Sequence, residues 1–180
     1  MCGRFHFGII DNPIGKQIKH KAQKMNLVFS EGEIFPTNNV LCIIPNESKV
    51  DLAVMKWGID AKSLIINARV ETINDKPTFN SIKNNRCAII CDGFYEWDKD
   101  KNKYFIDFES NYMYLACIFN EKSELVILTE AANNDFIKIH DRQPIVMNKD
   151  EMLKYIHNED GLFIRKKFKI NRVEDDIKLF

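Results

Sequence analysis

The stretch "CAIICDGFYEW" (residues 87–97) is a run of apolar, β-branched and aromatic residues near the middle of the chain. Such a run is typical of a buried strand. The runs of the same kind on either side of it are NVLCIIP (39–45), DLAVMKWGI (51–59), LIINARV (64–70), KYFIDF (103–108), YMYLACIF (112–119) and ELVILTEAA (124–132). The central part of the chain is therefore predicted to be mostly β-sheet.

Short helices are predicted before, between and after these runs. Residues 13–25 show helical spacing, Thr78 is expected to cap a second helix, and residues 133–139 form a third. A last helix is expected to start at Asn148, with Glu151 in the position of a capping box. Many strands with only short helices between them predict an α+β fold around a curved, barrel-like and mostly antiparallel sheet.

Length and composition fit one folded domain covering residues 1–180. Hydrophobic residues make up 45 % of the chain and include thirteen phenylalanines, enough for a core. No internal repeat, low-complexity tract or flexible linker divides the sequence. No apolar stretch approaches the roughly 20 residues needed to cross a bilayer, and the N-terminal region lacks a secretory signal. We therefore expect a soluble, cytoplasmic, monomeric protein.

The five cysteines are scattered and odd in number. Four of them lie in the apolar runs, where a free cysteine behaves as a small hydrophobic residue. Cys87 and Cys91 are four residues apart, which is not a CxxC pair, and no second cluster completes a zinc site. The sequence thus predicts packing roles for these four cysteines, and neither a metal nor a cofactor.

The charge pattern gives no global sign of nucleic-acid binding, because the formal net charge is zero. Only six of the 26 basic residues are arginines. Arginine is the residue that grips a phosphate or carboxylate with two parallel hydrogen bonds. Arg4, Arg69 and Arg142 fall in the stretches that stand out below on other grounds.

The N-terminus carries Cys2 directly after the initiator methionine. Removal of methionine before this small residue would leave an α-amine and a thiol on adjacent carbons. The amine can condense with an aldehyde to an imine, and the thiol can then close on the same carbon to give a thiazolidine ring. Taken alone, Cys2 is better explained as an ordinary residue at a frayed chain end, so the rest of the chain must support the chemical role.

Two strand ends carry polar side chains that suit chemistry. "NARVET" (67–72) follows an apolar run, and period-two alternation puts Asn67 and Arg69 on one face. Asn67 is expected to hydrogen-bond either a substrate oxygen or the Cys2 amine. "CDGFYEWD" (91–98) places Glu96 between two aromatic residues, where a carboxylate suits proton transfer and the rings suit stacking on unpaired bases. Each stretch alone also fits ordinary strand and loop residues.

A third stretch, "IHDRQP" (139–144), contains His140. It lies between a helical run and a proline-marked turn, so it is the strongest general acid/base candidate among the four histidines. Arg142 follows two residues later. A lone histidine is more often structural than catalytic, so this stretch too needs support from the others.

Taken in order, these motifs resemble one family. The matching pieces are MCGRF (1–5), FPTNN (35–39), MKWGI (55–59), INARVETI (66–73), RCAIICDGFYEW (86–97) and LTEAANNDFIKIHDRQPIVM (128–147). Together they are similar to the SOS response-associated peptidase (SRAP) family, the abasic-site processing proteins. The resemblance covers most of the chain, and several motifs in the right order are a specific signal.

The resemblance implies a protein that recognises abasic sites in single-stranded DNA during the response to DNA damage. It would bind the opened sugar aldehyde through the Cys2 amine, and the Cys2 thiolate would close a thiazolidine crosslink that protects the site. Self-reversal and autocatalytic removal of Met1 are implied as well, and binding to DNA would bring the protein to the nucleoid. The implied catalytic residues are Cys2, Asn67, Glu96 and His140, and the implied DNA-binding residues are Arg4, Trp57, Arg69, Trp97 and Arg142.

The proton-transfer roles of Glu96 and His140 stay open at this level, although reversal is expected to depend mostly on Glu96. Two departures concern DNA affinity. The family's proline and tryptophan after "WG" are missing in WGIDAKS (57–63), and Glu31 and Glu33 stand where the family motif has no acid. Acidic residues near a DNA groove weaken phosphate binding.

Two other classes of protein remain as alternatives. "MCG" also opens amidohydrolases of the glutamine amidotransferase type, in which an N-terminal cysteine attacks an amide. Their later motifs are absent from this sequence. The other alternative is a non-covalent DNA-binding module in which Cys2 has no chemical role.

Overall fold

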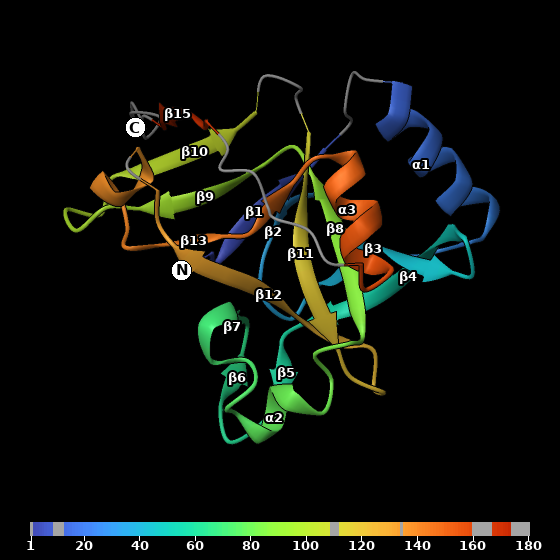
Figure 1. Cartoon of the computed structure of the whole chain (residues 1–180). Helices are drawn as coiled ribbons and strands as arrows, with labels where there is room; N and C mark the ends of the chain where they lie inside the picture. Colours follow the sequence, from blue (N-terminus) through green and yellow to red (C-terminus); the bar gives the residue numbers. More distant parts are fainter. Residues whose placement is uncertain (1, 9–12, 109–111, 134, 160–166, 174–180) are drawn as a thin grey trace.

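Two β-sheets make up most of the protein in the computed structural model, which describes residues 2–8, 13–108, 112–133, 135–159 and 167–173 (Figure 1). The larger sheet runs β13-β12-β4-β3-β8-β11-β14, and β7 pairs with β12. Its strands are β3 (Asn39–Asn46), β4 (Lys49–Trp57), β7 (Asn67–Arg69), β8 (Arg86–Cys91), β11 (Met113–Phe119), β12 (Glu124–Ala131), β13 (Arg142–Pro144) and β14 (Val146–Met147).

The larger sheet closes on itself, because β12 pairs with β4 on one side and with β11 on the other. The path β12-β4-β3-β8-β11 then returns to β12. Its ladders are antiparallel except where β12 meets β4 and β7. The α+β prediction with a barrel-like, mostly antiparallel sheet is confirmed.

The smaller sheet has five strands in the order β15-β10-β9-β1-β2, all antiparallel. They are β1 (Arg4–Phe7), β2 (Gly32–Ile34), β9 (Gly93–Trp97), β10 (Lys103–Asp107) and β15 (Lys169–Arg172). Side chains alternate between the two faces of this sheet. Phe5, Phe94 and Ile106 face the core and are buried, whereas Arg4 and Tyr95 lie on the outer face.

The stretch 87–97 forms two strands, where the sequence indicated one, and each strand belongs to a different sheet. Asp92 separates β8 from β9 because its backbone N–H donates to His6 O (2.9 Å) and its side chain accepts from Gly8 N (2.7 Å). Gly93 then crosses close to β10, where a Cβ atom would lie 2.5 Å from Ile106 O. This short stretch therefore joins the two halves of the fold.

The helices are short. They are α1 (Pro13–Lys24), α2 (Pro77–Asn80) and α3 (Lys149–Ile156), with 3₁₀ turns η1 (Val70–Thr72) and η2 (Phe136–Lys138). The capping box at the start of α3 is confirmed, since Asn148 and Glu151 exchange hydrogen bonds of 2.9 and 2.8 Å. The cap predicted at Thr78 is wrong, because Lys76 precedes the helix and Pro77 occupies its first turn.

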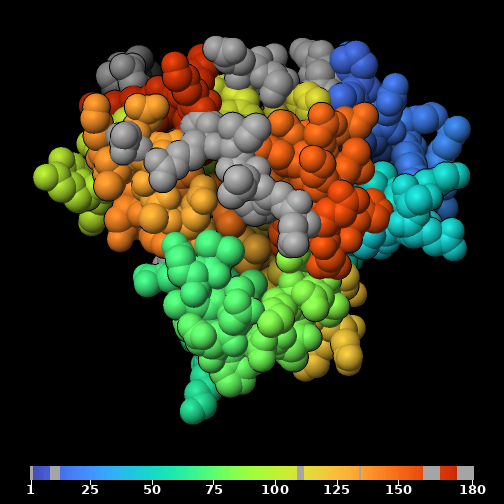
Figure 2. All heavy atoms as spheres, in the orientation of Figure 1, coloured from blue at the N-terminus to red at the C-terminus, as the bar shows by residue number. Residues whose placement is uncertain are grey.

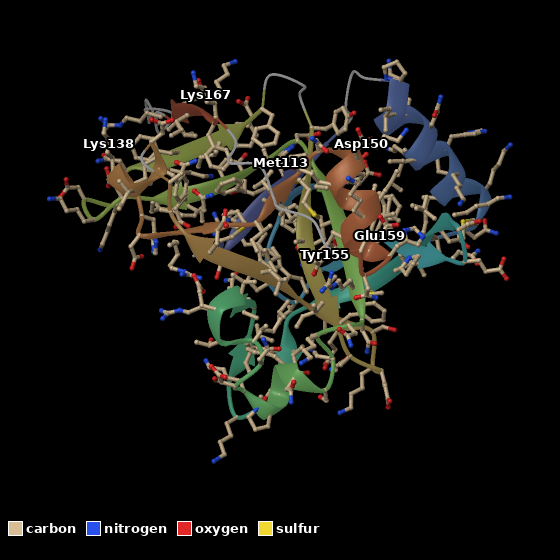
Figure 3. The ribbon with its side chains drawn as sticks, viewed as in Figure 1. Met113, Lys138, Asp150, Tyr155, Glu159 and Lys167 are labelled. Carbon is tan, nitrogen blue, oxygen red and sulfur yellow. The ribbon has the colours of Figure 1, made fainter. Side chains whose placement is uncertain are left out.

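The predicted helix at residues 133–139 is only the 3₁₀ turn η2, and Asn134 of that stretch lies outside the described residues. The packing role of the four cysteines in the apolar runs is confirmed, since Cys42, Cys87, Cys91 and Cys117 are buried and unpaired by disulfides. Helix α3 packs on the larger sheet through Tyr155, whose hydroxyl donates to Cys117 O at 2.9 Å. Figure 3 labels Tyr155 on this helix, beside β8 and β11.

A small hairpin of β5 (Ile59–Asp60) and β6 (Leu64–Ile65) leads into β7. Together with α2 it forms the part that projects from the sheets in Figure 1, and it stands out as a green lobe in Figure 2. Among the described residues, no helix combines the length and the apolar character that a membrane span requires.

Candidate active site

Cys2 lies two residues before the start of β1 and is fully buried. Its backbone carbonyl accepts a hydrogen bond of 2.9 Å from the side-chain amide of Asn67. Cys2 and Asn67 are 65 residues apart in the sequence, so this bond ties the start of the chain to the larger sheet. The predicted proximity of these two residues is seen in the structure, although the acceptor is the carbonyl and not the amine.

The position of Asn67 follows from the parallel pairing of β7 with β12, in which Asn67 lies opposite Ile127. Its Nδ2 donates to Cys2, and its Oδ1 is buried with no hydrogen-bond partner among the described residues. A buried acceptor without a partner costs free energy. Asn67 therefore offers one acceptor to a group that arrives beside Cys2.

Glu96 is buried on the inner face of β9, with only 5 % of its surface exposed. Its neighbours Tyr95 and Trp97 lie on the outer face, because side chains alternate along a strand. The arrangement suggested by the sequence, a carboxylate between two rings, is therefore wrong in space. Glu96 points towards the core side where Cys2 lies, and the two rings point away from it.

The electrostatics link Glu96 to Cys2. Burial raises the pKa of the Cys2 thiol well above its ordinary range, and the nearby Glu96 carboxylate raises this pKa further. Both effects disfavour the thiolate. At neutral pH the Cys2 sulfur is therefore a thiol, in contrast to the thiolate expected from the sequence, and it must lose its proton as it reacts.

His140 lies between η2 and β13. Its Nδ1 is 3.0 Å from the backbone N–H of Arg142 and 2.8 Å from a carboxylate oxygen of Asp141. The first contact needs an unprotonated Nδ1, which leaves the proton of a neutral ring on Nε2, whereas the second contact is favourable when Nδ1 is protonated.

Arg142 connects the His140 stretch to the Asn67 stretch. Its guanidinium pairs with both carboxylate oxygens of Glu71, at 2.7 and 2.8 Å, and donates to Thr129 O at 2.8 Å. Thr129 lies opposite Arg69 in the β7–β12 ladder. The two stretches thus lie on either side of β12, one on β7 and the other at β13, and the ion pair between Glu71 and Arg142, which the sequence did not predict, joins them.

The arginines predicted to bind phosphate differ in availability. Arg69 is exposed, whereas only 11 % of the Arg142 side chain is exposed and its charge is paired with Glu71. Arg4 lies on the outer face of the smaller sheet and pairs with Glu33 at 3.1 Å. Glu71 was missed because it resembles any exposed helix-start residue, although its place two residues after Arg69 in "NARVET" is the signal that marks it.

Trp57 does not fit the prediction that it stacks on DNA bases. Its side chain is fully buried, its ring packs 5.2 Å from the ring of Phe5, and its Nε1 donates to Ile66 O at 3.0 Å. Neither ring face is open to a base, so Trp57 is a core residue that supports β1 and β4. Trp97 is half-buried on the outer face, where stacking is geometrically open to it.

The described residues include no group of three or more His, Cys, Asp or Glu side chains arranged to hold a metal ion. The polar groups around Cys2 are an amide, a carboxylate and the protein backbone. This set suits proton transfer and the orientation of a carbonyl carbon beside an amine and a thiol.

Several curated proteins are similar to this chain. It is 30 % identical to the abasic site processing protein YoaM of Bacillus subtilis (strain 168) over 187 residues, covering 87 % of this chain and 79 % of the relative. It is 28 % identical to the abasic site processing protein YoqW of the same organism, covering 87 % and 80 %. It is 25 % identical to the abasic site processing protein YedK of Escherichia coli (strain K12), covering 88 % and 81 %.

Two crystal structures from Bordetella bronchiseptica share the fold. One gives a TM-score of 0.74 at 15 % identity and covers 96 % of this chain and 100 % of the other. The second, a phage-related protein, gives 0.68 at 18 % identity and covers 98 % and 96 %. The family model described as SOS response associated peptidase (SRAP) matches residues 1–170. Because this match covers most of the chain and the motifs occur in the family's order, the chain belongs to the SRAP family.

Proposed function

We propose that this protein processes abasic sites in single-stranded DNA and attaches itself covalently to them through Cys2. Membership of the SRAP family supports this proposal, as do the relatives named abasic site processing proteins. The observation that carries it is the hydrogen bond of 2.9 Å from Asn67 to the carbonyl of Cys2. It fixes the residue whose amine and thiol would react, and it holds that residue beside a buried carboxylate.

The reaction begins after removal of Met1, a residue outside the described part of the chain. The Cys2 amine attacks the aldehyde carbon of the opened sugar to form a carbinolamine. Loss of water from that carbon gives an imine. The Cys2 sulfur then bonds to the same carbon while the imine nitrogen gains a proton. One water leaves in total, and the product is a thiazolidine ring.

The proton transfers follow from the state of the thiol. Because burial and Glu96 keep Cys2 protonated, the sulfur proton must leave as the S–C bond forms. Glu96 is the carboxylate that acts on this thiol, so we assign it the acceptor role in ring closure and the donor role when the ring reopens. His140 is then left to assist the departure of water, and Asn67 orients Cys2.

The proposal is tested by mixing the purified protein with a single-stranded oligonucleotide that contains one abasic site. A band of reduced mobility on a denaturing gel is expected for the wild type, and no such band for Cys2→Ala or for an undamaged oligonucleotide. A band of equal intensity with Cys2→Ala would overturn the proposal. Release of ammonia from glutamine would instead support the amidohydrolase alternative.

Reversal offers a further test of the role of Glu96. Glu96→Gln is expected to form the crosslink more slowly and to release it more slowly, since both directions move a proton to or from sulfur. Release is measured by adding an excess of a second abasic oligonucleotide of different length and following the exchange of bands. Removal of Met1 by the protein itself is part of the same proposal, and so is a location at the nucleoid when the protein is bound to DNA.

A further inference from the structure

A row of aromatic and charged side chains crosses the outer face of the smaller sheet. The ladders place Arg4 opposite Tyr95 and Lys103 opposite Trp97. Phe35, directly after β2, packs against Arg4 from the other side. These five residues, called the outer row, lie on the opposite face from the buried Glu96. The outer row is therefore a surface separate from the interior around the Cys2 thiol.

The cations of the outer row lie against its rings. The guanidinium carbon of Arg4 is 4.1 Å from the ring centre of Phe35 and 5.1 Å from that of Trp97. Lys103 Nζ is 4.1 Å from the ring centre of Tyr95 and 5.7 Å from that of Trp97. Aromatic faces interleaved with positive charge are how proteins bind single-stranded nucleic acid, because bases stack on the rings and phosphates meet the cations.

One carboxylate pairs with both cations. Oε1 of Glu33, on β2, lies 3.1 Å from Arg4 Nη1 and 2.8 Å from Lys103 Nζ. Partial burial opposes ionisation of Glu33, but the hydrogen bonds from Lys103 and Arg4 outweigh it and lower the pKa of this carboxyl. Glu33 is therefore an anion at neutral pH, positioned where a phosphate oxygen would meet the same two donors.

The ion pair with Glu33 uses only part of the hydrogen-bonding capacity of the Arg4 guanidinium. Only Nη1 reaches the carboxylate, and Nε is buried with no hydrogen-bond partner among the described residues. Arg142, in contrast, engages Glu71 through two nitrogens, at 2.7 and 2.8 Å. A group with several oxygens, such as a phosphodiester, can satisfy more of the Arg4 fork than Glu33 does.

We propose that Glu33 occupies a phosphate-binding position between Arg4 and Lys103, and that a backbone phosphate of single-stranded DNA replaces it on binding. This inference rests on the proposed function. It adds Lys103 to the DNA contacts and makes Glu33 a built-in competitor of DNA. Two cations and one anion then meet the incoming strand, so the protein binds undamaged DNA more weakly than its bare cations would.

The experiment compares Glu33→Gln with Glu31→Gln, which removes the same charge two residues away. Glu31 pairs with Lys19 on α1, at 2.6 Å, and is not part of the outer row. Affinity for an undamaged, labelled single strand is measured by fluorescence anisotropy over a series of salt concentrations. Glu33→Gln is expected to bind about two- to fivefold more tightly, as for loss of a partly exposed ion pair, with a salt slope steeper by roughly 0.7.

Glu31→Gln should change the affinity less than Glu33→Gln. Equal effects of the two variants would show a general charge effect and overturn the inference. A second variant, Lys103→Met, keeps the apolar stem over Tyr95 and should weaken binding and flatten the salt slope. If the gain from Glu33→Gln persists in full in the double variant with Lys103→Met, the phosphate position between the two cations is also refuted.

The same proteins are assayed for crosslinking to the abasic oligonucleotide, so that the two ideas can fail separately. A wild type that crosslinks, with Glu33→Gln binding no better than Glu31→Gln, refutes the inference and leaves the proposed function standing. A wild type that never crosslinks, with Glu33→Gln binding more tightly, supports the outer row as a strand-binding surface and refutes the proposed covalent function.

Discussion

At the scale of single residues, the proposed reaction gives the amine and the thiol of Cys2 separate roles. Cys2→Ser keeps the amine but replaces the sulfur with a poorer nucleophile. We expect this variant to form an imine that borohydride traps, and to lose most of the stable crosslink when no borohydride is added. The measurement is the intensity of the shifted band on denaturing gels with and without borohydride. No trapped product with Cys2→Ser would count against the imine step.

Contacts between motifs were easier to predict from the sequence than the exposure of each residue. Cys2 was one of the two partners expected for Asn67, and the structure shows a hydrogen bond between the two residues, made through the Cys2 carbonyl. Trp57 was misjudged because a tryptophan before a glycine looks the same whether its ring faces solvent or, as here, packs on Phe5. Which face of a strand is buried depends on partners far away in the sequence.

At the scale of elements, α3 depends on its N-terminal cap. Asn148→Ala removes a hydrogen bond to the first turn, and replacing such a cap typically costs about 1 kcal/mol. Helix α3 covers β8 and β11, so we expect the whole fold to lose stability by about that amount. Chemical denaturation followed by tryptophan fluorescence measures it. Lys154→Ala, at an exposed position of the same helix, is the comparison, and equal losses for the two would argue against the capping role.

The ion pair between Glu71 in η1 and Arg142 in β13 makes the stability of the fold depend on pH. The hydrogen bonds from Arg142 lower the pKa of Glu71 to about 2, against roughly 4.3 for an unfolded glutamate. The folded form therefore gains stability above pH ~4.3 and loses it as the pH falls towards ~2. The difference in unfolding free energy between wild type and Glu71→Gln should shrink over this window. A difference independent of pH would contradict the role of the pair.

Elements with strong local signals were predicted well, and those fixed by tertiary contacts were not. The α3 capping box is written in four consecutive residues, and the strand runs matched observed strands because their apolar patterns are long. The break at Asp92 escaped prediction because it depends on hydrogen bonds to His6 and Gly8, over 80 residues away. The Thr78 cap failed since Pro77 already suits the first helical turn.

At the scale of the whole molecule, the net charge is zero, but the arginines differ in how far their positive charges are exposed to solvent. Arg69 is exposed, whereas Arg142 is mostly covered and neutralised by Glu71. Arg69→Ala should therefore weaken binding to undamaged single strands and reduce the salt slope by roughly 0.7. Arg142→Ala should reduce the salt slope less than Arg69→Ala does. Titrations over a salt series test this order, and a larger effect for Arg142→Ala would reverse it.

The closure of the larger sheet could not be predicted in detail from the sequence. Its ring depends on β12 pairing with both β4 and β11, which brings residues 56 and 124 together. No local pattern specifies such a long-range ladder, whereas the number of apolar runs was enough to indicate a curved sheet. The site depends on this closure, because β12 also holds β7 with Asn67 and β13 with Arg142.

One measurement on peptides tests directly whether DNA is bound covalently to the N-terminal residue of the protein. The adduct formed without any reductant is digested, and the fragment that carries the sugar is sequenced by mass spectrometry. We predict a fragment that starts at Cys2, lacks Met1 and weighs one water less than its two parts combined. A sugar remnant on an internal lysine, or a stable adduct on chains that retain Met1, would contradict the account.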